Sequence, residues 1–320
     1  MDKAIKYKLS VVIPVYNSQE TIGALIDQLT EILIKYDYEI ILIDDYSKDK
    51  SREICLSKCK KYAGRVKYHM LSKNFSEHNA VIAGLNCAEG DYAVIMDDDF
   101  QNPPEEIPRM IESMINNRFD VLYTYYEEKK HNWFRNFGSW FNNKVAAFLL
   151  KLPKGLYLSS FKCINRFIIN EIIKYRGPYP YIDGLIMRAT GNFGTIAVLH
   201  QSRKHGHSNY TLRKLMALWL NMFINFSVVP LRVSFLTGFL MAILGMFMIF
   251  YFLLDMYVFH SQGPWPAGWF SLITSVVVFS GAQLMFIGLV GEYIGRLFLT
   301  ENGTPQYVIR ESRGVSEKDG

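Results

Sequence analysis

Residues 94–104 read Val94-Ile95-Met96-Asp97-Asp98-Asp99-Phe100-Gln101-Asn102-Pro103-Pro104, an apolar run that ends in three consecutive carboxylates. Adjacent carboxylates repel one another and raise each other's pKa, so this cluster at a predicted strand end indicates a cationic partner. If the strand conformation persists, Asp97, Asp99 and Gln101 share one face while Asp98 points to the other. Such hard oxygen ligands suit Mg²⁺ or Mn²⁺ held against substrate phosphates. The alternative is a solvated acidic turn before a helix.

Alternating strands and helices are predicted around this stretch. The predicted strands are 9–15, 38–43, 66–71, 92–96 and 120–126. Asn17 and Glu20 resemble a capping box for the first helix, Ser47 is predicted to open the second, and the Pro103-Pro104 pair the fourth. The third helix is predicted over 77–87. This alternation predicts an α/β fold, a mostly parallel sheet with helices on both faces.

Three polar motifs are expected to meet at one edge of this sheet, because ligands of such sheets bind beyond the carboxyl ends of the strands. They are Pro14-Val15-Tyr16-Asn17, Asp44-Asp45 and Asp97-Asp98-Asp99. An edge with a helix N-terminus, two acid clusters and an aromatic ring suits a nucleotide, whose ribose or base donates hydrogen bonds to an acid. The sequence has neither GxGxxG nor GxxxxGK[ST], which argues against dinucleotide redox chemistry and against a P-loop ATPase.

Half of the 320 residues of the chain are hydrophobic. Two long apolar runs dominate its C-terminal third. Residues 233–254 and 269–291 contain no Asp, Glu, Lys, Arg or His. Each run is about 22 residues long, enough to cross a bilayer as a helix. Two transmembrane helices are therefore predicted. Two buried core helices are the alternative, although core helices of this length normally keep a polar face.

The charges around these runs predict their orientation, because Lys and Arg accumulate in short cytoplasmic loops. Basic residues flank the pair on the outer sides, and the connector 255–268 has none; they are Arg203, Lys204, Arg213, Lys214, Arg232, Arg296, Arg310 and Arg313. Both termini are therefore expected in the cytoplasm. The polar N-terminal segment 1–8 leads into a strand and predicts no secretory signal. The net charge of +5 favours an anionic membrane surface as partner over nucleic acid.

These motifs together resemble the family 2 glycosyltransferases of the GT-A fold, and specifically the membrane-anchored polyisoprenyl-phosphate glycosyltransferases. That group includes dolichol-phosphate mannose synthases and bacterial undecaprenyl-phosphate sugar transferases. The resemblance covers nearly the whole chain. It rests on residues 10–17, 43–47, 72–80, 97–106, 203–210, 230–232 and 288–296.

The resemblance implies a role for each matching residue. Nucleotide contacts are implied for Pro14, Tyr16, Asn17, Asp44, Asp45, Lys73, Asp97 and Asp98. Asp99 and Gln101, with Asp97, would hold the Mg²⁺ or Mn²⁺. The chain departs from the family pattern at two places. Ser18 replaces the acid that usually follows Tyr16-Asn17, and a Gly-Asp-Phe-Arg segment becomes Ser159-Ser160-Phe161-Lys162.

The implied reaction is an inverting transfer of a sugar, with a UDP-linked donor as first choice, to undecaprenyl phosphate. Asp97 and Asp99 are the expected catalytic acids. The acceptor phosphate is largely ionised near neutral pH because its second pKa is about 6, so it needs cationic clamping rather than a base. The candidates for that clamp are Arg203, Lys204 and Arg135.

Two other functions remain open at this point. A hydroxyl acceptor on a glycan or glycerolipid would need a base, and Asp183 falls where related enzymes place one. Asp183 could equally be a turn acid before Gly184. A non-catalytic membrane partner that binds nucleotide is a third interpretation.

The predicted organisation has four parts. They are a cytoplasmic GT-A domain over 1–202, a basic loop and amphipathic helix over 203–232, a transmembrane pair over 233–296 and a cytoplasmic tail over 297–320. The aromatic-rich segment 131–152 is predicted to be helical, either at the membrane interface or in ordinary packing. The expected location is the bacterial inner membrane, and a homo-oligomer such as a tetramer is compatible with the sequence.

Overall fold

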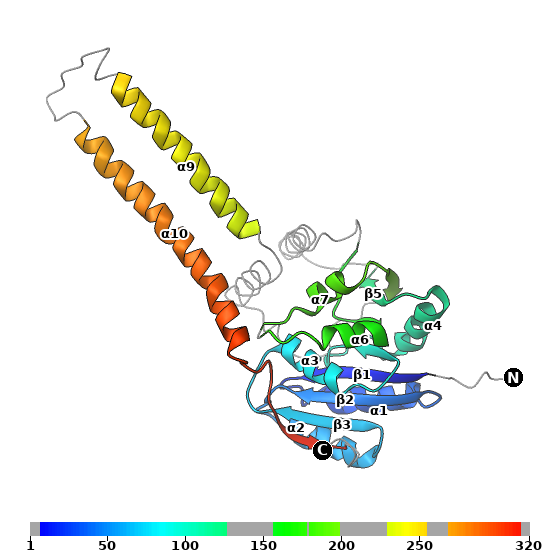
Figure 1. Cartoon of the computed structure of the whole chain (residues 1–320). Helices are drawn as coiled ribbons and strands as arrows, with labels where there is room; N and C mark the ends of the chain where they lie inside the picture. Colours follow the sequence, from blue (N-terminus) through cyan, green and yellow to red (C-terminus); the bar gives the residue numbers. More distant parts are fainter. Residues whose placement is uncertain (1–6, 127–155, 178, 199–228, 255–267, 315–320) are drawn as a thin grey trace. The chain divides into compact units, whose positions relative to one another are not determined.

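The computed structural model describes residues 7–126, 156–177, 179–198, 229–254 and 268–314. The chain divides into two compact units (Figure 1). One unit comprises residues 1–212 together with 303–320, and the other comprises residues 213–302. The chain therefore leaves the first unit and later returns to it. The predicted helix over 131–152, residues 203–228 of the predicted basic loop and amphipathic helix, and residues 255–267 of the connector lie outside the described residues.

The first unit is built on one eight-stranded sheet with the order β7-β5-β6-β4-β1-β2-β3-β8. Its strands are β1 (Lys8–Val15), β2 (Asp37–Asp44), β3 (Val66–Leu71), β4 (Tyr92–Ile95), β5 (Val121–Tyr126), β6 (Lys162–Asn165), β7 (Phe193–Val198) and β8 (Ile309–Arg313). The central strands β4, β1, β2 and β3 are parallel to one another. The predicted α/β fold with a mostly parallel sheet is confirmed.

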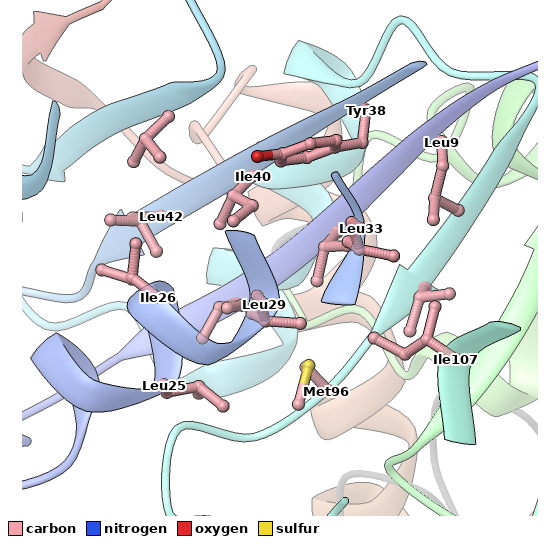
Figure 2. Packing of buried hydrophobic residues seen from close by; sticks show 14 of the residues in the cluster. Leu9, Leu25, Ile26, Leu29, Leu33, Tyr38, Ile40, Leu42, Met96 and Ile107 are labelled. Carbon is pink, nitrogen blue, oxygen red and sulfur yellow. The ribbon is translucent and has the colours of Figure 1, made fainter. Parts of the chain in front are cut away.

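Helices cover both faces of this sheet. They are α1 (Ile22–Ile32), α2 (Ser51–Lys61), α3 (Glu77–Cys87), the 3₁₀ turn η1 (Pro104–Glu106), α4 (Ile107–Asn117), α6 (Arg166–Ile172) and α7 (Ile182–Ala189). The apolar stripe of α1 packs into a core with Leu9, Ile40 and Leu42 of the sheet (Figure 2). Odd-numbered residues of β1 face this core, whereas Val12 faces Gly84 of α3 on the other side. Side-chain alternation along β1 thus separates the two helical layers.

Two helix starts differ from the prediction. Helix α1 begins at Ile22, and the side chain of Asn17 accepts a hydrogen bond of 2.8 Å from the Lys48 backbone N–H instead of capping it. Helix α2 begins at Ser51, and the Ser47 hydroxyl accepts a 3.0 Å bond from the Asn17 N–H. These polar side chains join two neighbouring loops, a use that capping patterns in the sequence do not reveal.

The C-terminal strand β8 was not predicted. It pairs antiparallel with β3 and forms the edge of the sheet. Three of its five residues are charged, Arg310, Glu311 and Arg313. An edge strand with charged side chains is a common way to protect a sheet edge, and it lacks the apolar alternation by which strands are recognised.

The second unit contains the helices α9 (Val229–Leu254) and α10 (Trp269–Glu301). Phe286 and Phe279 of α10 lie against Gly238 and Gly245 of α9. Among the described residues, one segment, Val278–Glu301, is long and apolar enough to cross a membrane by length and composition. The apolar stretch in α9, Val233–Phe247, is shorter. Both predicted apolar runs are therefore helical. Within the described residues, α10 contains a segment that could span a membrane and α9 contains a shorter one, so two transmembrane helices are not confirmed.

Gly84 provides a test of the packing of α3 on the sheet. A Cβ at this position would overlap Val12 Cγ1 and lie 3.2 Å from Ile43 Cγ1. We expect Gly84→Ala to destabilise the protein by about 1–3 kcal/mol because the close-packed strands cannot give way. Thermal unfolding in detergent would show this as a Tm lowered by several degrees.

The matched control is Gly191→Ala, because a Cβ at Gly191 meets nothing within 4 Å. Its Tm should stay close to that of the wild type. Equal Tm values for both variants would contradict this account of the α3 packing.

Candidate functional site

The carboxyl ends of the central strands lie together. Val15 is in register with Asp44, and the Asp45 N–H donates a 2.9 Å bond to the Val15 carbonyl. The Met96 N–H donates a 3.2 Å bond to the Val12 carbonyl. The three polar motifs therefore share one edge of the sheet, as predicted.

Backbone strain is concentrated at this edge. Four residues other than glycine have a positive φ in the loops that follow the four parallel strands: Asn17 (55°), Tyr46 (67°), Ser76 (77°) and Phe100 (61°). A left-handed conformation costs a residue with a Cβ roughly 1–2 kcal/mol. Strain of this kind is typical of functional sites, where the surrounding structure holds it in place.

The two acids at the end of β2 accept hydrogen bonds from other groups of the protein. Buried Asp44 accepts bonds from the Ser47 N–H at 2.8 Å and the Tyr68 hydroxyl at 2.7 Å. Asp45 accepts bonds from the N–H groups of Phe75 at 2.6 Å and Ser76 at 3.0 Å, just before α3. Burial raises the pKa of Asp45 to about 6, against the effect of these two bonds. Asp45 thus connects the end of β2 to the loop before α3.

Asp98 connects β4 to the loop after β1. It accepts a 3.3 Å bond from the Tyr16 N–H and a bond from the Ser18 hydroxyl. Burial raises the pKa of Asp98 to about 7, and the charges of Asp97 and Asp99 add to the effect. The Ser18 departure has a physical reason here, because a hydroxyl donates to Asp98 where an acid would repel it.

Asp97 points to different neighbours. Its carboxylate accepts a 2.6 Å bond from the Ser160 hydroxyl and a 3.2 Å bond from the Asn102 amide. Burial and the charge of Glu77 raise the pKa of Asp97 to about 6. Ser160 belongs to the segment that departs from the family pattern, and it contacts the metal motif directly.

The expected strand alternation does not extend to Gln101. Strand β4 ends at Ile95, and the left-handed Phe100 turns the backbone before Gln101. The Gln101 N–H donates a 3.1 Å bond to Asp99 Oδ1, within a tight turn. Gln101 therefore does not share a strand face with Asp97 and Asp99, and its role in metal binding stays a prediction.

Glu77 is an acid at this site that the sequence analysis did not assign. It stands in the first turn of α3, directly after the loop held by Asp45. Burial raises the pKa of Glu77; the charge of Lys162 opposes this rise, and the charges of Asp183 and Asp99 add to it. Glu77 lies in the 72–80 motif, after a predicted parallel strand, and this position could have identified it as a candidate site residue.

This cluster suits a cation that shares its ligands with a substrate. Among the residues that the structure describes, no group of three or more His, Cys, Asp or Glu side chains converges into a complete ligand set. The charge of Glu77 nevertheless adds to the burial that raises the pKa of Asp97, and the charge of Asp99 raises the pKa of both groups. An adjacent cation would relieve this repulsion. Mg²⁺ is typically bound by one or two carboxylates, with water and phosphate oxygens as the remaining ligands.

Asp183 is a member of a buried ion pair. Its carboxylate binds the Lys162 ammonium and accepts a 3.0 Å bond from the Tyr123 hydroxyl. Asp183 and Lys162 are both buried. A base for a hydroxyl acceptor needs access to that acceptor. The contacts of Asp183 instead fasten the start of α7 to β5 and β6.

Comparison with known proteins agrees with this geometry. Residues 10–173 match the model of glycosyl transferase family 2, and residues 229–297 match that of the GtrB C-terminal hairpin. The chain belongs to glycosyl transferase family 2. It is 33% identical to an undecaprenyl-phosphate 4-deoxy-4-formamido-L-arabinose transferase of Edwardsiella ictaluri, over 99% of this chain and 97% of the relative. The enzyme of that name from Serratia proteamaculans is 32% identical, over 96% and 94%.

A solved structure has a fold similar to that of much of this chain. Glucosyl-3-phosphoglycerate synthase of Mycobacterium tuberculosis, in complex with Mn²⁺, UDP and phosphoglyceric acid, superposes with a TM-score of 0.53. The match covers 68% of this chain and 77% of that one, at 18% identity. This likeness establishes the fold.

The remaining predicted site residues of this glycosyltransferase lie at the same edge or outside the described residues. Pro14 is in register with Ile43, and Tyr16 keeps 44% of its surface exposed, available to a ligand. The ammonium of Lys73 lies 5.0 Å from the centre of the Phe75 ring, in the loop after β3. Arg203, with Lys204 and Arg135, lies outside the described residues.

The raised pKa of Asp98 predicts how stability changes with pH. The folded protein binds this proton more tightly than the unfolded chain does, so stability is greatest at low pH and falls as pH rises towards about 7. Asp98→Asn removes this group. We expect its Tm to fall less than that of the wild type between about pH 4 and pH 7, measured with a metal chelator present.

Asp49→Asn is the matched control because the pKa of Asp49 is lowered, whereas that of Asp98 is raised. Burial raises the pKa of Asp49, but hydrogen bonds outweigh burial and keep this pKa below its ordinary value. They include bonds from the Ser51 and Gln19 N–H groups, each 3.0 Å long. The contribution of Asp49 is present above the unfolded pKa and is lost as pH falls. If the Tm of Asp98→Asn and that of the wild type changed equally between about pH 4 and pH 7, the raised pKa of Asp98 would be contradicted.

The Lys162–Asp183 pair predicts matched losses of stability. Removing either partner leaves a buried charge unpaired, so Lys162→Met and Asp183→Asn should each cost about 3–5 kcal/mol. Lys174→Met, which breaks the exposed pair with Glu171, should change little. Thermal unfolding measures all three. If Asp183→Asn instead abolished turnover at an unchanged Tm, Asp183 would be a base and the hydroxyl acceptor would be favoured.

Proposed function

We propose that this family 2 glycosyltransferase transfers a sugar from a UDP-linked donor to undecaprenyl phosphate, with inversion at the anomeric carbon. The main support is that Asp44, Asp97 and Asp99 lie at the same edge of the sheet, at the ends of parallel strands. The full-length similarity to undecaprenyl-phosphate sugar transferases supports the choice of acceptor. The UDP in the solved neighbour supports the choice of nucleotide.

In this proposal the nucleotide lies against the loops after β1, β2 and β3. Tyr16 offers an exposed ring for the base, and Lys73 lies near the nucleotide. Asp44 is fully buried and holds the loop after β2 by accepting bonds from the Ser47 N–H and the Tyr68 hydroxyl. Pro14, Asn17, Asp45 and Asp98 shape these loops through their backbone and side-chain bonds. The Mn²⁺ complex of the solved neighbour supports a divalent cofactor.

Asp99 and Gln101, with Asp97, are the proposed ligands of Mg²⁺ or Mn²⁺. The ion supplies Lewis-acid stabilisation of the charge that develops on the departing UDP. Ser160 and Asn102 hold the carboxylate of Asp97 for this task. Glu77 adds negative charge beside Asp97 and increases the preference of the site for a cation.

The burial of Asp183 favours a phosphate acceptor over a hydroxyl. A phosphate oxygen attacks the anomeric carbon as the bond to UDP breaks, and no proton has to be removed from an ionised phosphate. The acceptor then requires cations, for which Arg203, Lys204 and Arg135 are proposed. The hydroxyl acceptor on a glycan or glycerolipid becomes the second candidate.

We propose that α9 and α10 cross the inner membrane as a hairpin. Strand β8 follows α10 and pairs with β3 of the same sheet, which supports an even number of membrane crossings between these two strands. An odd number of crossings between residues 213 and 302 would separate these two strands. The basic flanks and the uncharged connector favour the cytoplasm for the catalytic domain, both termini and the tail.

The decisive experiment is a transfer assay. Detergent-solubilised protein is incubated with Mn²⁺ or Mg²⁺, undecaprenyl phosphate and a mixture of sugar nucleotides, and the lipids are analysed by mass spectrometry. A new lipid-phosphate sugar is expected, and its mass identifies the sugar class. Asp99→Ala should lower the rate on the order of 100-fold because the metal-assisted stabilisation of the leaving group is lost.

The matched control is Asp91→Asn, because Asp91 precedes β4 and so lies at the opposite edge of the sheet from Asp99. It should retain full activity. Metal-dependent release of UDP without a lipid product would overturn the acceptor assignment and favour a hydroxyl. Nucleotide binding without any turnover would favour a non-catalytic partner.

A further inference from the structure

The segment that follows α10 is bonded to two loops of the catalytic domain. Gln306 is 8% exposed, and its amide nitrogen donates bonds of 2.9 Å to the Tyr175 carbonyl and 2.7 Å to the Gly177 carbonyl. These carbonyls follow α6, in the segment that leads to α7. One buried side chain therefore satisfies two carbonyls of this turn.

Two residues further on, the same segment holds the loop after β3. The Ser72 N–H donates a 2.8 Å bond to the Val308 carbonyl, and Leu71 is in register with Ile309. Ser72 directly precedes Lys73. The far end of this loop is held by Asp45, through the N–H groups of Phe75 and Ser76.

Both loops lead into the acid cluster. The loop after β3 opens α3 with Glu77, and the segment after α6 opens α7 with Asp183. The rings of His78 and Tyr181 are 5.2 Å apart and nearly perpendicular, so the starts of these two helices are also in contact. Residues 306–308 thus bridge the two chain segments that carry one side of the site.

We propose that Gln306 is a positioning residue for the nucleotide-sugar site, acting through these two loops. It sets the spacing between Lys73, in the loop after β3, and the start of α7, without touching the donor itself. The identity of the ligand rests on the proposed function. Four residues, 302–305, connect the end of α10 to Gln306 along the chain.

The outer part of the same strand provides a matched control. Glu311 of β8 binds the Arg52 guanidinium at 2.7 Å and the Arg313 guanidinium at 3.3 Å, at the edge of the sheet. Its substitution weakens the attachment of β8 but not the contacts of Gln306. A purely structural role of the C-terminal segment predicts similar effects at both positions.

The test compares Gln306→Met, which keeps the length of the side chain but has no donor, with Glu311→Gln. For each full-length protein in detergent, calorimetry gives the Kd for UDP with Mn²⁺, kinetics gives KM and kcat for the donor, and thermal unfolding gives Tm. We expect Gln306→Met to raise Kd and KM about tenfold with a smaller change in kcat, because misplaced binding groups weaken ligand contacts. Glu311→Gln should leave Kd and KM unchanged.

Gln306→Asn is made in parallel, since it keeps the amide but shortens its reach, and it should give a smaller rise in Kd. An unchanged Kd in the Gln306 variants overturns the proposal, as does an equal rise in Glu311→Gln. If the wild type binds UDP but transfers no sugar to undecaprenyl phosphate, the proposed function fails. The comparison of Kd values then still decides the role of Gln306.

Discussion

Repulsion between carboxylates at the carboxyl edge of the sheet is the constraint on which the rest of the site depends. Parallel strands bring their ends together, and here those ends carry acids from β2 and β4. Several acids in and beside this edge accept hydrogen bonds or form an ion pair within the protein. Asp45 receives two backbone N–H groups, Asp98 receives Tyr16 and Ser18, Asp97 receives Ser160 and Asn102, and Asp183 receives Lys162 and Tyr123. The acids and the loops that support them form one unit.

The departures from the family pattern fit this arrangement. Ser18 replaces an acid and donates to Asp98, and Ser160 replaces another acid and donates to Asp97. Both replacements of an acid by serine lower the negative charge at this edge, whereas Glu77 contributes a negative charge there. The balance of charge is therefore kept by different residues. Mutational studies of relatives should be transferred to this chain by the contact that a residue makes rather than by its position.

Connectivity adds a second constraint. The sheet is completed by a strand that comes after both long apolar helices, so folding of the catalytic domain requires the chain to return to it. A charged edge strand also protects β3 from pairing with another chain. The C-terminal segment therefore belongs to the catalytic domain, whereas the sequence pattern had presented it as a tail.

The sequence by itself determined the α/β alternation, the common edge of the acid motifs and the two apolar runs, because these depend on short-range periodicity and on the ends of parallel strands. It misplaced the starts of α1 and α2, since Asn17 and Ser47 bond to each other's loops rather than to their own helices. Only the tertiary structure decided the Lys162–Asp183 pair and the contacts of Gln306. Their partners lie 21 and about 130 residues away, and no local pattern encodes a pairing over that separation.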